Sequence, residues 1–464
     1  MKHIHLIGIG GSGLSAIALL LKERGYVVSG SDRDLSPLAE ELIRKGMDVK
    51  IGHAAANVSG ADLVIRSSAI PLDNPEIQAA LDAGIPVLKR SEFLSQLMQD
   101  SHCIAVAGTH GKTTTTAMLA WILTGLQKDP SFVIGGVSKN LGTNAHAGKG
   151  NDFIIEADEY DRMFLGLYPD IAVITNLEHD HPDCYPTGQD YLAAFRDFAN
   201  QIKDLGTLII NKEDPNTNTL IASLTKHINI FSYGLLPDAN YAAEHINLNS
   251  QGGLSFSFSF KKDEQAPVEL GSVHLQVPGE HNVRNALAAL AVVHQMGLDL
   301  SKAANLLSKF SGTGRRFDLL GTAHGIAVIN DYAHHPTEIQ ATLSAARSRY
   351  PNQEIWVVWQ PHTFSRTFTL IDRFTAAFLN ADHVIVSEVY AAREKNDGLS
   401  AKAVVEKMVH PDVRFIANLA EISRYLIDSL KPGDVLLVLS AGDADKISTE
   451  VLNSLAGKEQ NHGE

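Results

Sequence analysis

The chain has 464 residues, so at roughly 150 residues per domain we expect about three domains rather than one core. Its composition, 44% hydrophobic and 20% charged, is that of an ordinary soluble globular protein, and its net charge of -14 argues against a nucleic-acid surface, because such surfaces use Lys and Arg to neutralise phosphates. The two cysteines, Cys103 and Cys184, imply no disulfide framework, and no apolar run is long enough for a membrane span. We therefore expect a cytoplasmic protein that binds neither nucleic acid nor membrane.

The first segment has the pattern of a parallel α/β unit. An apolar strand, His3–Ile7, runs into GIGGSG and a helical stretch, and the next strand ends at Asp32. Gly8, Gly10 and Gly13 fit the G-x-G-x-x-G fingerprint of dinucleotide-binding loops. Such glycines let the backbone approach a phosphate at a helix N-terminus, so the loop predicts a diphosphate cradle, with a merely tight turn as the alternative.

The second segment contains the sequence GTHGKTTTT, residues 108–116, which begins at the last residue of the apolar run CIAVAG. The usual phosphate loop is G-x-x-x-x-G-K-[ST], and this loop is two residues shorter. Lys112 can still reach the β- and γ-phosphates of a nucleotide, and a Thr113 or Thr114 hydroxyl can hold Mg²⁺. A strand-loop-helix turn with an incidental lysine is the alternative. The residues assigned to this loop are Gly108, Thr109, Gly111, Lys112, Thr113 and Thr114.

Polar residues follow two further strands of this segment. Glu156, in EADEYD, and His181, in TNLEHDHPD, are metal-ligand candidates at strand ends, although each of these loop residues could instead be solvated. In GEHNVRNALAA, His281 and Asn285 are four residues apart and share a face at a helix start. This pair can recognise a purine edge and ribose, or it can cap the helix.

The third segment follows SGTGRRF and alternates apolar strands, in GIAVIND, EIWVVWQ, DHVIVSEV and DVLLVLSAG, with helical stretches. Linkers near Gln99 and at Gly312 to Gly314 separate the three segments. The fold class that we predict is α/β, and the predicted domains are residues 1–99, 100–313 and 314–464.

Four motifs, GTHGKTTT, EADEYD, TNLEHDHPD and GEHNVRNALAA, resemble in this order the Mur ligase family, the ATP-dependent amide-bond ligases of peptidoglycan precursor synthesis. Five further stretches resemble its alanine-adding branch: GIGGSGLSAIA, SSAIPLDNPEI, DYAHHPTEI, QPHTFSRT and SAGDADK. The resemblance covers essentially the whole chain. It implies an N-terminal Rossmann-like domain for a UDP-sugar, a central P-loop-type ATPase domain with a mainly parallel sheet, and a C-terminal Rossmann-like domain for the amino acid.

The resemblance also implies roles for individual residues. The expected UDP-sugar contacts are Gly10, Gly11, Ser12, Gly13, Asp32, Ser67 and Ser68. The expected ATP contacts, besides the loop, are His281, Asn285, Arg316 and Asp331, and the expected Mg²⁺ ligands are Thr113, Thr114, Glu156 and His181. The expected catalytic group is His110, Lys112, His334, His335, His362 and Arg366.

The reaction implied is ADP-forming ligation of L-alanine to the lactyl carboxylate of UDP-N-acetylmuramic acid, with ATP and Mg²⁺, by a monomer or weak homodimer. Alanine-adding members can carry Arg directly after the histidine of QPH, where this chain has Thr363. Arg366 then holds the amino-acid carboxylate alone, and the preference among L-alanine, glycine and L-serine stays open.

Three other functions remain to be weighed. A nicotinamide-dependent oxidoreductase explains the first glycine loop and Asp32 but leaves the second phosphate loop without a role. A non-catalytic protein on the ligase fold would bind both nucleotides and release no phosphate. A sibling ligase would attach a whole peptide to the same sugar in cell-wall recycling; GIGGSG and QPHTFSRT speak against it, by resemblance.

Overall fold

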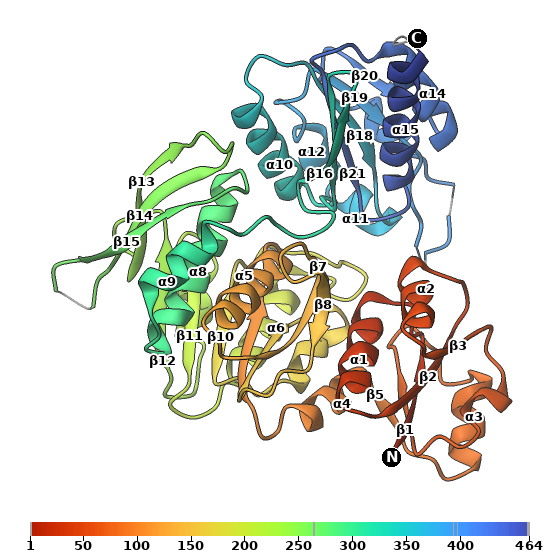
Figure 1. The fold of residues 1–464 in the computed structure, drawn as a ribbon, viewed down its shortest axis with the longest axis vertical. Coiled ribbons are helices and arrows are strands. Elements are labelled where there is room, and N and C mark those ends of the chain that lie inside the picture. Colours follow the sequence, from red (N-terminus) through yellow and green to blue (C-terminus); the bar gives the residue numbers. More distant parts are fainter. Residues whose placement is uncertain (1, 263–264, 393, 397, 462–464) are drawn as a thin grey trace.

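A computed structural model describes residues 2–262, 265–392, 394–396 and 398–461. Three β-sheets, each flanked by helices, follow one another along the chain (Figure 1). The N-terminal unit lies beside the central unit, and the C-terminal unit stands above the central one in this view. Among the described residues, no helix combines the length and apolarity needed to cross a membrane.

The N-terminal sheet has five parallel strands in the order β3-β2-β1-β4-β5. The predicted strand His3–Ile7 and the predicted strand ending at Asp32 are both present. The strand β3 was not predicted, because its sequence, DVKI, is mostly exposed and carries two charges. The elements are β1 (His3–Ile7), α1 (Ser12–Glu23), β2 (Val27–Asp32), α2 (Pro37–Arg44), β3 (Asp48–Ile51), η1 (Ala55–Val58), β4 (Leu63–Arg66), α3 (Pro75–Asp82), β5 (Val87–Lys89) and α4 (Arg90–Leu97).

The central sheet has ten strands in the order β15-β14-β13-β12-β11-β10-β6-β9-β7-β8. Its middle is parallel and buried on both faces, which explains the continuous apolar runs of β6, β9, β10 and β11. The elements are β6 (His102–Ala107), α5 (Lys112–Gly125), β7 (Ser131–Ser138), β8 (Thr143–His146), β9 (Asp152–Glu156), η2 (Tyr160–Gly166), β10 (Ile171–Ile174), α6 (Gly188–Ala199), β11 (Thr207–Asn211), α7 (Thr217–Ala222), β12 (Asn229–Gly234), β13 (Tyr241–Leu248), β14 (Leu254–Phe260), β15 (Val268–His274), α8 (Glu280–Gln295) and α9 (Leu300–Leu307).

The C-terminal sheet has six strands in the order β16-β17-β21-β18-β19-β20, all parallel except the edge strand β16. Apolar clusters fill both of its faces. The elements are β16 (Asp318–Ala323), β17 (Ile326–Asp331), α10 (Pro336–Arg349), β18 (Ile355–Gln360), α11 (Phe364–Thr369), α12 (Ile371–Thr375), β19 (His383–Val386), α13 (Lys402–Val405), β20 (Val413–Phe415), α14 (Leu419–Ser429), β21 (Val435–Ser440) and α15 (Asp445–Asn461).

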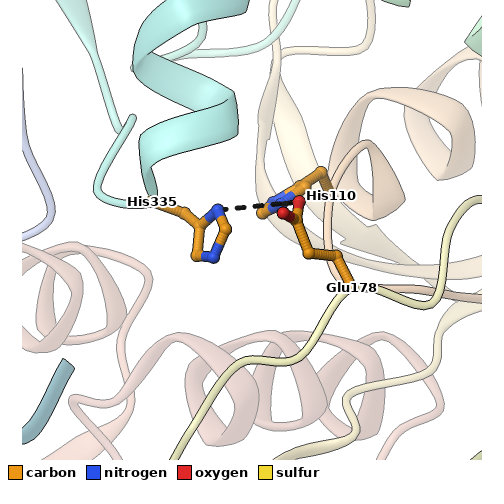
Figure 2. Close-up of side chains that lie close together, drawn as sticks. All are labelled: His110, Glu178 and His335. Atoms are coloured by element: carbon orange, nitrogen blue, oxygen red, sulfur yellow. Dashed lines mark hydrogen bonds and ion pairs between the residues drawn. The ribbon is translucent and has the colours of Figure 1, made fainter. Parts of the chain in front are cut away.

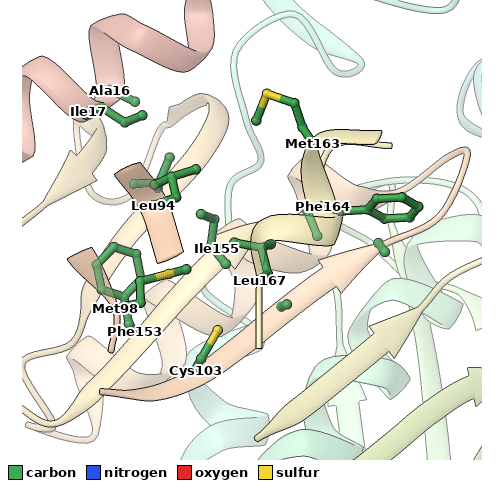
Figure 3. Packing of buried hydrophobic residues seen from close by; sticks show 14 of the residues in the cluster. Ala16, Ile17, Leu94, Met98, Cys103, Phe153, Ile155, Met163, Phe164 and Leu167 are labelled. Atoms are coloured by element: carbon green, nitrogen blue, oxygen red, sulfur yellow. The ribbon is translucent and has the colours of Figure 1, made fainter. Parts of the chain in front are cut away.

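The N-terminal and central units share one apolar core. Ile17 of α1 and Leu94 of α4 belong to the same buried cluster as Phe153 of β9 and Phe164 of η2 (Figure 3). Burial of apolar surface contributes about 25 cal/mol per Å², so this shared core holds the two units together. The central and C-terminal units, by contrast, have separate apolar clusters in the described part of the chain. We keep 1–99, 100–313 and 314–464 as proposed domain limits.

Candidate functional site

The predicted phosphate loop joins β6 to α5, with Gly111 as the residue before the helix. Gly111 has φ +83°, and a Cβ added there would lie 2.5 Å from Oδ1 of Asn285. Gly108 has φ +130° and is packed against Thr175. Both positions therefore require glycine. The loop runs directly into α5, and the first backbone N–H groups of a helix favour a bound anion.

Lys112 lies buried within this loop. Its Nζ donates to the carbonyl oxygens of Gly108 (2.6 Å) and Thr109 (3.1 Å) and lies 2.8 Å from a carboxylate oxygen of Glu159. Burial alone would lower the pKa of Lys112, but the charges of Glu159 and Glu156 raise it. The lysine is therefore a fixed cation at the start of α5, ready to neutralise phosphate charge.

Thr113 at the end of the loop and Glu156 beside it offer oxygen atoms that could bind a metal ion. Thr113 Oγ1 donates to Oε1 of Glu156 at 3.0 Å, and the Gly135 amide donates to Oε2 at 2.6 Å. Burial raises the pKa of the Glu156 carboxyl, and Lys112 with these two hydrogen bonds opposes that effect. A hydroxyl and a carboxylate suit Mg²⁺, which prefers oxygen ligands.

His181, the other predicted ligand, is directed at the same region. Its Nε2 lies 3.5 Å from Oε1 of Glu159, the carboxylate that also pairs with Lys112. Burial lowers the pKa of His181, but Asp180 and Glu159 outweigh it and raise the value. Glu159 thus links the lysine to the histidine.

A cavity of about 280 Å³ opens beside the loop, between the central and C-terminal units. It is lined by parts of β11, β12, α8 and α10 together with the loop. The predicted nucleotide-binding residues among its walls are Gly111, Thr113, Thr114, His281, Asn285, Arg316 and Asp331. Burial in this wall lowers the pKa of His281 to about 4, which keeps that ring neutral. The structure therefore brings together predicted residues that are up to 220 positions apart in the sequence.

Polar contacts join the loop to the C-terminal unit. His110 Nε2 lies 3.1 Å from Glu178 of the central unit, and its Nδ1 lies 3.1 Å from Glu338 of α10. Glu178 also accepts from Thr337 Oγ1 at 2.9 Å and pairs with Arg373 of α12 at 2.5 Å. Figure 2 shows His110, Glu178 and His335 facing one another across this boundary.

Arg366 is buried and already paired. Its Nε lies 2.7 Å and its Nη2 3.2 Å from the two carboxylate oxygens of Asp180. Its Nη1 lies 3.1 Å from Nδ1 of His362. The predicted amino-acid-binding arginine thus extends from the C-terminal unit to the predicted metal region, because Asp180 precedes His181.

His334 and His335, the two residues directly before α10, are neutral. Burial lowers the pKa of His334 to about 4; burial and the neighbouring His110 lower that of His335 to about 3. A ring with so low a pKa is a weak base, so both imidazoles are neutral hydrogen-bonding groups at this boundary.

The first glycine loop lies outside this cavity. The Gly10 amide donates to Oδ2 of Asp32 at 2.8 Å, so Asp32 helps to shape the loop. Ser67 packs against Gly8, and its neighbour Ser68 is part-exposed beside it, whereas Gly11 and Ser12 are exposed at the start of α1. The predicted sugar-nucleotide residues therefore gather at the carboxyl ends of β1, β2 and β4, as ligand sites of open parallel sheets do.

Arg90, which the sequence did not single out, lies between the first glycine loop and Asp158 of the central unit. Its guanidinium lies where a Cβ on Gly13 would fall, and its Nη2 donates to Oδ2 of Asp158 at 2.9 Å. A guanidinium at a helix N-terminus reinforces binding of a diphosphate.

We expect Arg90→Gln to weaken UDP-sugar binding by roughly tenfold or more, measured by titration calorimetry, with ATP binding changed less than threefold. Equal losses for both nucleotides would contradict a role at the first loop.

The contact of His110 with two carboxylates makes stability depend on pH. Burial lowers the pKa of His110, but Glu338 and Glu178 overcome this effect and raise it from 6.5 to about 9. A raised pKa means that the folded state retains a proton that the unfolded chain loses, so this stabilisation is complete below about pH 6.5 and is lost as the pH rises through about 9.

We therefore expect the melting temperature of the unaltered protein to fall between pH 7 and 9 by several degrees more than that of His110→Asn. The measurement is differential scanning calorimetry of both proteins over this range. Parallel pH curves for the two would show that His110 is not the group responsible.

The sequence analysis did not single out three carboxylates of the site: Glu159, Glu178 and Glu338. All lie inside the motifs EADEYD, TNLEHDHPD and DYAHHPTEI. A signal was available only for Glu338, which stands three residues after His335 and closes a capping box at the start of α10. The pairings of Glu159 and Glu178 depend on tertiary structure.

The fold and the site define a nucleotide-dependent α/β enzyme with a phosphate-loop ATPase unit between two further sheet units. Comparison with known proteins agrees. Residues 3–102 match the Mur ligase family catalytic domain, residues 106–293 the Mur ligase middle domain, and residues 315–442 the Mur ligase glutamate ligase domain. The chain belongs to the Mur ligase family.

Similar proteins cover nearly the whole chain. UDP-N-acetylmuramate-L-alanine ligases from Alkaliphilus metalliredigens and Desulfosudis oleivorans are 42% and 41% identical, and each match spans 97% of this chain and 97% or 98% of the relative. The structure of UDP-N-acetylmuramate-alanine ligase from Thermotoga maritima superimposes with a TM-score of 0.82 at 29% identity over 100% of both chains. A murein peptide ligase from Psychrobacter arcticus gives 0.73 at 29% identity, covering 98% of this chain and 99% of that chain.

Proposed function

We propose that this protein is an ADP-forming ligase that joins L-alanine to the lactyl carboxylate of UDP-N-acetylmuramic acid in peptidoglycan precursor synthesis. The observation that carries the proposal is the cavity beside the phosphate loop, which unites loop, α8 and C-terminal residues, in a chain whose relatives at about 40% identity are alanine ligases. Family membership leaves the oxidoreductase alternative without support.

The first step transfers the γ-phosphoryl group of ATP to the lactyl carboxylate, giving an acyl phosphate and ADP. Both reactants are anions, so the site must neutralise charge. Lys112 supplies a buried cation, and the amides of the α5 N-terminus supply hydrogen-bond donors. Mg²⁺, held by Thr113 or Thr114, Glu156 and His181, would supply further positive charge at the phosphates.

The second step is attack of the alanine amine on the acyl carbon, followed by loss of phosphate. Arg366 is proposed to hold the amino-acid carboxylate, and its pairing with Asp180 orients it beside His181. The amine must be uncharged to attack. Burial makes His334 and His335 neutral but weakly basic, so they are proposed to position the amine by hydrogen bonding.

The reacting atoms lie at the boundary between the central and C-terminal units in this proposal. The polar contacts of Glu178, Glu338 and Asp180 hold that boundary closed, which excludes water from the acyl phosphate. Residues His110 and His362 lie at the same boundary and are proposed to position the substrates.

The test is phosphate release from purified protein with ATP, Mg²⁺ and UDP-N-acetylmuramic acid, comparing L-alanine, glycine, L-serine and the recycled tripeptide. We expect release to require both the sugar nucleotide and L-alanine. If the tripeptide were the only acceptor that supports release, the mechanism would stand but the acceptor would be a peptide, as in a murein peptide ligase. If no acceptor supported release, the protein would be a non-catalytic nucleotide-binding protein.

A further inference from the structure

Two imidazoles and a carboxylate meet at the boundary between the central and C-terminal units. His110, Glu178 and His335 each offer one ligand atom, and these atoms lie within 4.8 Å of one another. Oε2 of Glu178 lies 3.1 Å from Nε2 of His110 and 3.7 Å from Nδ1 of His335. Ligand atoms about 2.0–2.2 Å from a tetrahedral Zn²⁺ are separated by about 3.3–3.6 Å, so only small movements would close the set around an ion.

Two of these side chains, His110 and Glu178, are also held by partners that face away from the centre. Nδ1 of His110 lies 3.1 Å from Glu338, and Oε1 of Glu178 accepts from Thr337 and pairs with Arg373. Partners of this kind orient metal ligands and are typical of built metal sites, where the non-ligating imidazole nitrogen contacts a carboxylate. His335 is fully buried; its Nδ1 accepts from the Thr337 amide at 3.4 Å, and its Nε2 has no hydrogen-bond partner in the described structure.

We propose that His110, Glu178 and His335 form a transition-metal site, best suited to Zn²⁺, that is separate from the Mg²⁺ position at Thr113 and Glu156. Two imidazoles and one carboxylate with an open fourth position favour Zn²⁺ over Mg²⁺, which prefers oxygen ligands. The ligands come from both units, so a bound ion joins them and takes His110 away from the reacting groups.

The test is binding of Co²⁺ and Zn²⁺ to the full chain without substrates, in excess Mg²⁺, so that the result is independent of the ligase reaction. We expect one Co²⁺ per chain with the visible absorption of a four-coordinate ion, displaced by Zn²⁺. Glu178→Gln and His335→Gln are expected to weaken Zn²⁺ binding by roughly 10–100-fold.

The matched control is His146→Gln, which removes a part-exposed imidazole that also lies between two carboxylates, Glu23 and Asp129. This control should bind Zn²⁺ like the unaltered protein. The proposal is overturned if Glu178→Gln binds as tightly as the unaltered chain, or if His146→Gln loses as much affinity as the site variants.

A second measurement uses the unaltered protein and so does not depend on how the variants fold. X-ray absorption of the Zn²⁺-loaded chain is expected to show two imidazole ligands and low coordination number. A shell of six oxygen atoms would mean that the ion is bound elsewhere, and the three side chains would then form only an ion-paired contact between the units.

Discussion

Lys112→Ala is expected to lower the turnover number by roughly 10³-fold or more while UDP-sugar binding stays within about threefold of normal. Lys112 is the cation inside the phosphate loop, whereas the first glycine loop lies in a different unit of the fold. The measurements are phosphate release at saturating substrates and calorimetric titration with UDP-N-acetylmuramic acid.

The variant also removes the lysine that pairs with buried Glu159 and leaves only His181 beside that carboxylate; breaking a buried ion pair costs about 3–5 kcal/mol. The double variant Lys112→Ala with Glu159→Gln removes that cost and should recover stability without recovering turnover. Lys128→Ala, at an exposed lysine beyond the end of α5, is the matched control and should retain full activity. Turnover retained in Lys112→Ala would show that the loop is not the triphosphate site.

Arg366→Ala is expected to raise the Michaelis constant for L-alanine by roughly 10²-fold, with less than a threefold change for ATP. A buried guanidinium that already forms two contacts with Asp180 is rigidly oriented for a second carboxylate. Initial rates as a function of each substrate, with the other two saturating, give the two constants.

Asp180→Asn tests whether the pairing orients Arg366, and it should raise the same constant by a smaller factor. Arg347→Ala, which breaks an ion pair with Asp382 elsewhere in the C-terminal unit, is the control. If Arg366→Ala changed the constants for ATP and L-alanine equally, the arginine would act on the closure of the units and not on the amino acid.

The sequence predicted the parallel part of the fold well because buried parallel strands are apolar throughout. β1, β6, β17 and β21 were found from their runs, and the glycines after β1 and β6 located the two loops. Strands such as β3 and β20 were not predicted because they are short, lie at sheet edges and carry charged residues.

The site was predicted as separate motifs, and only the fold shows which of them meet. Gly111 and Asn285 are 174 positions apart yet pack directly, which no local pattern encodes. The same holds for the pairing of Arg366 with Asp180 and of Glu178 with Arg373, since ion pairs between units depend on how the sheets dock. Arg90 was overlooked for the same reason, because its relation to Gly13 exists only once α4 lies beside α1.

The central claim is that the lactyl carboxylate attacks ATP before the amino acid is joined. Its most direct test is to supply UDP-N-acetylmuramic acid labelled with ¹⁸O in that carboxylate, together with ATP and L-alanine, and to analyse the released phosphate by mass spectrometry. The account predicts that one labelled oxygen passes to phosphate for every amide bond formed. Unlabelled phosphate alongside amide product would contradict an acyl phosphate and require another route to the same bond.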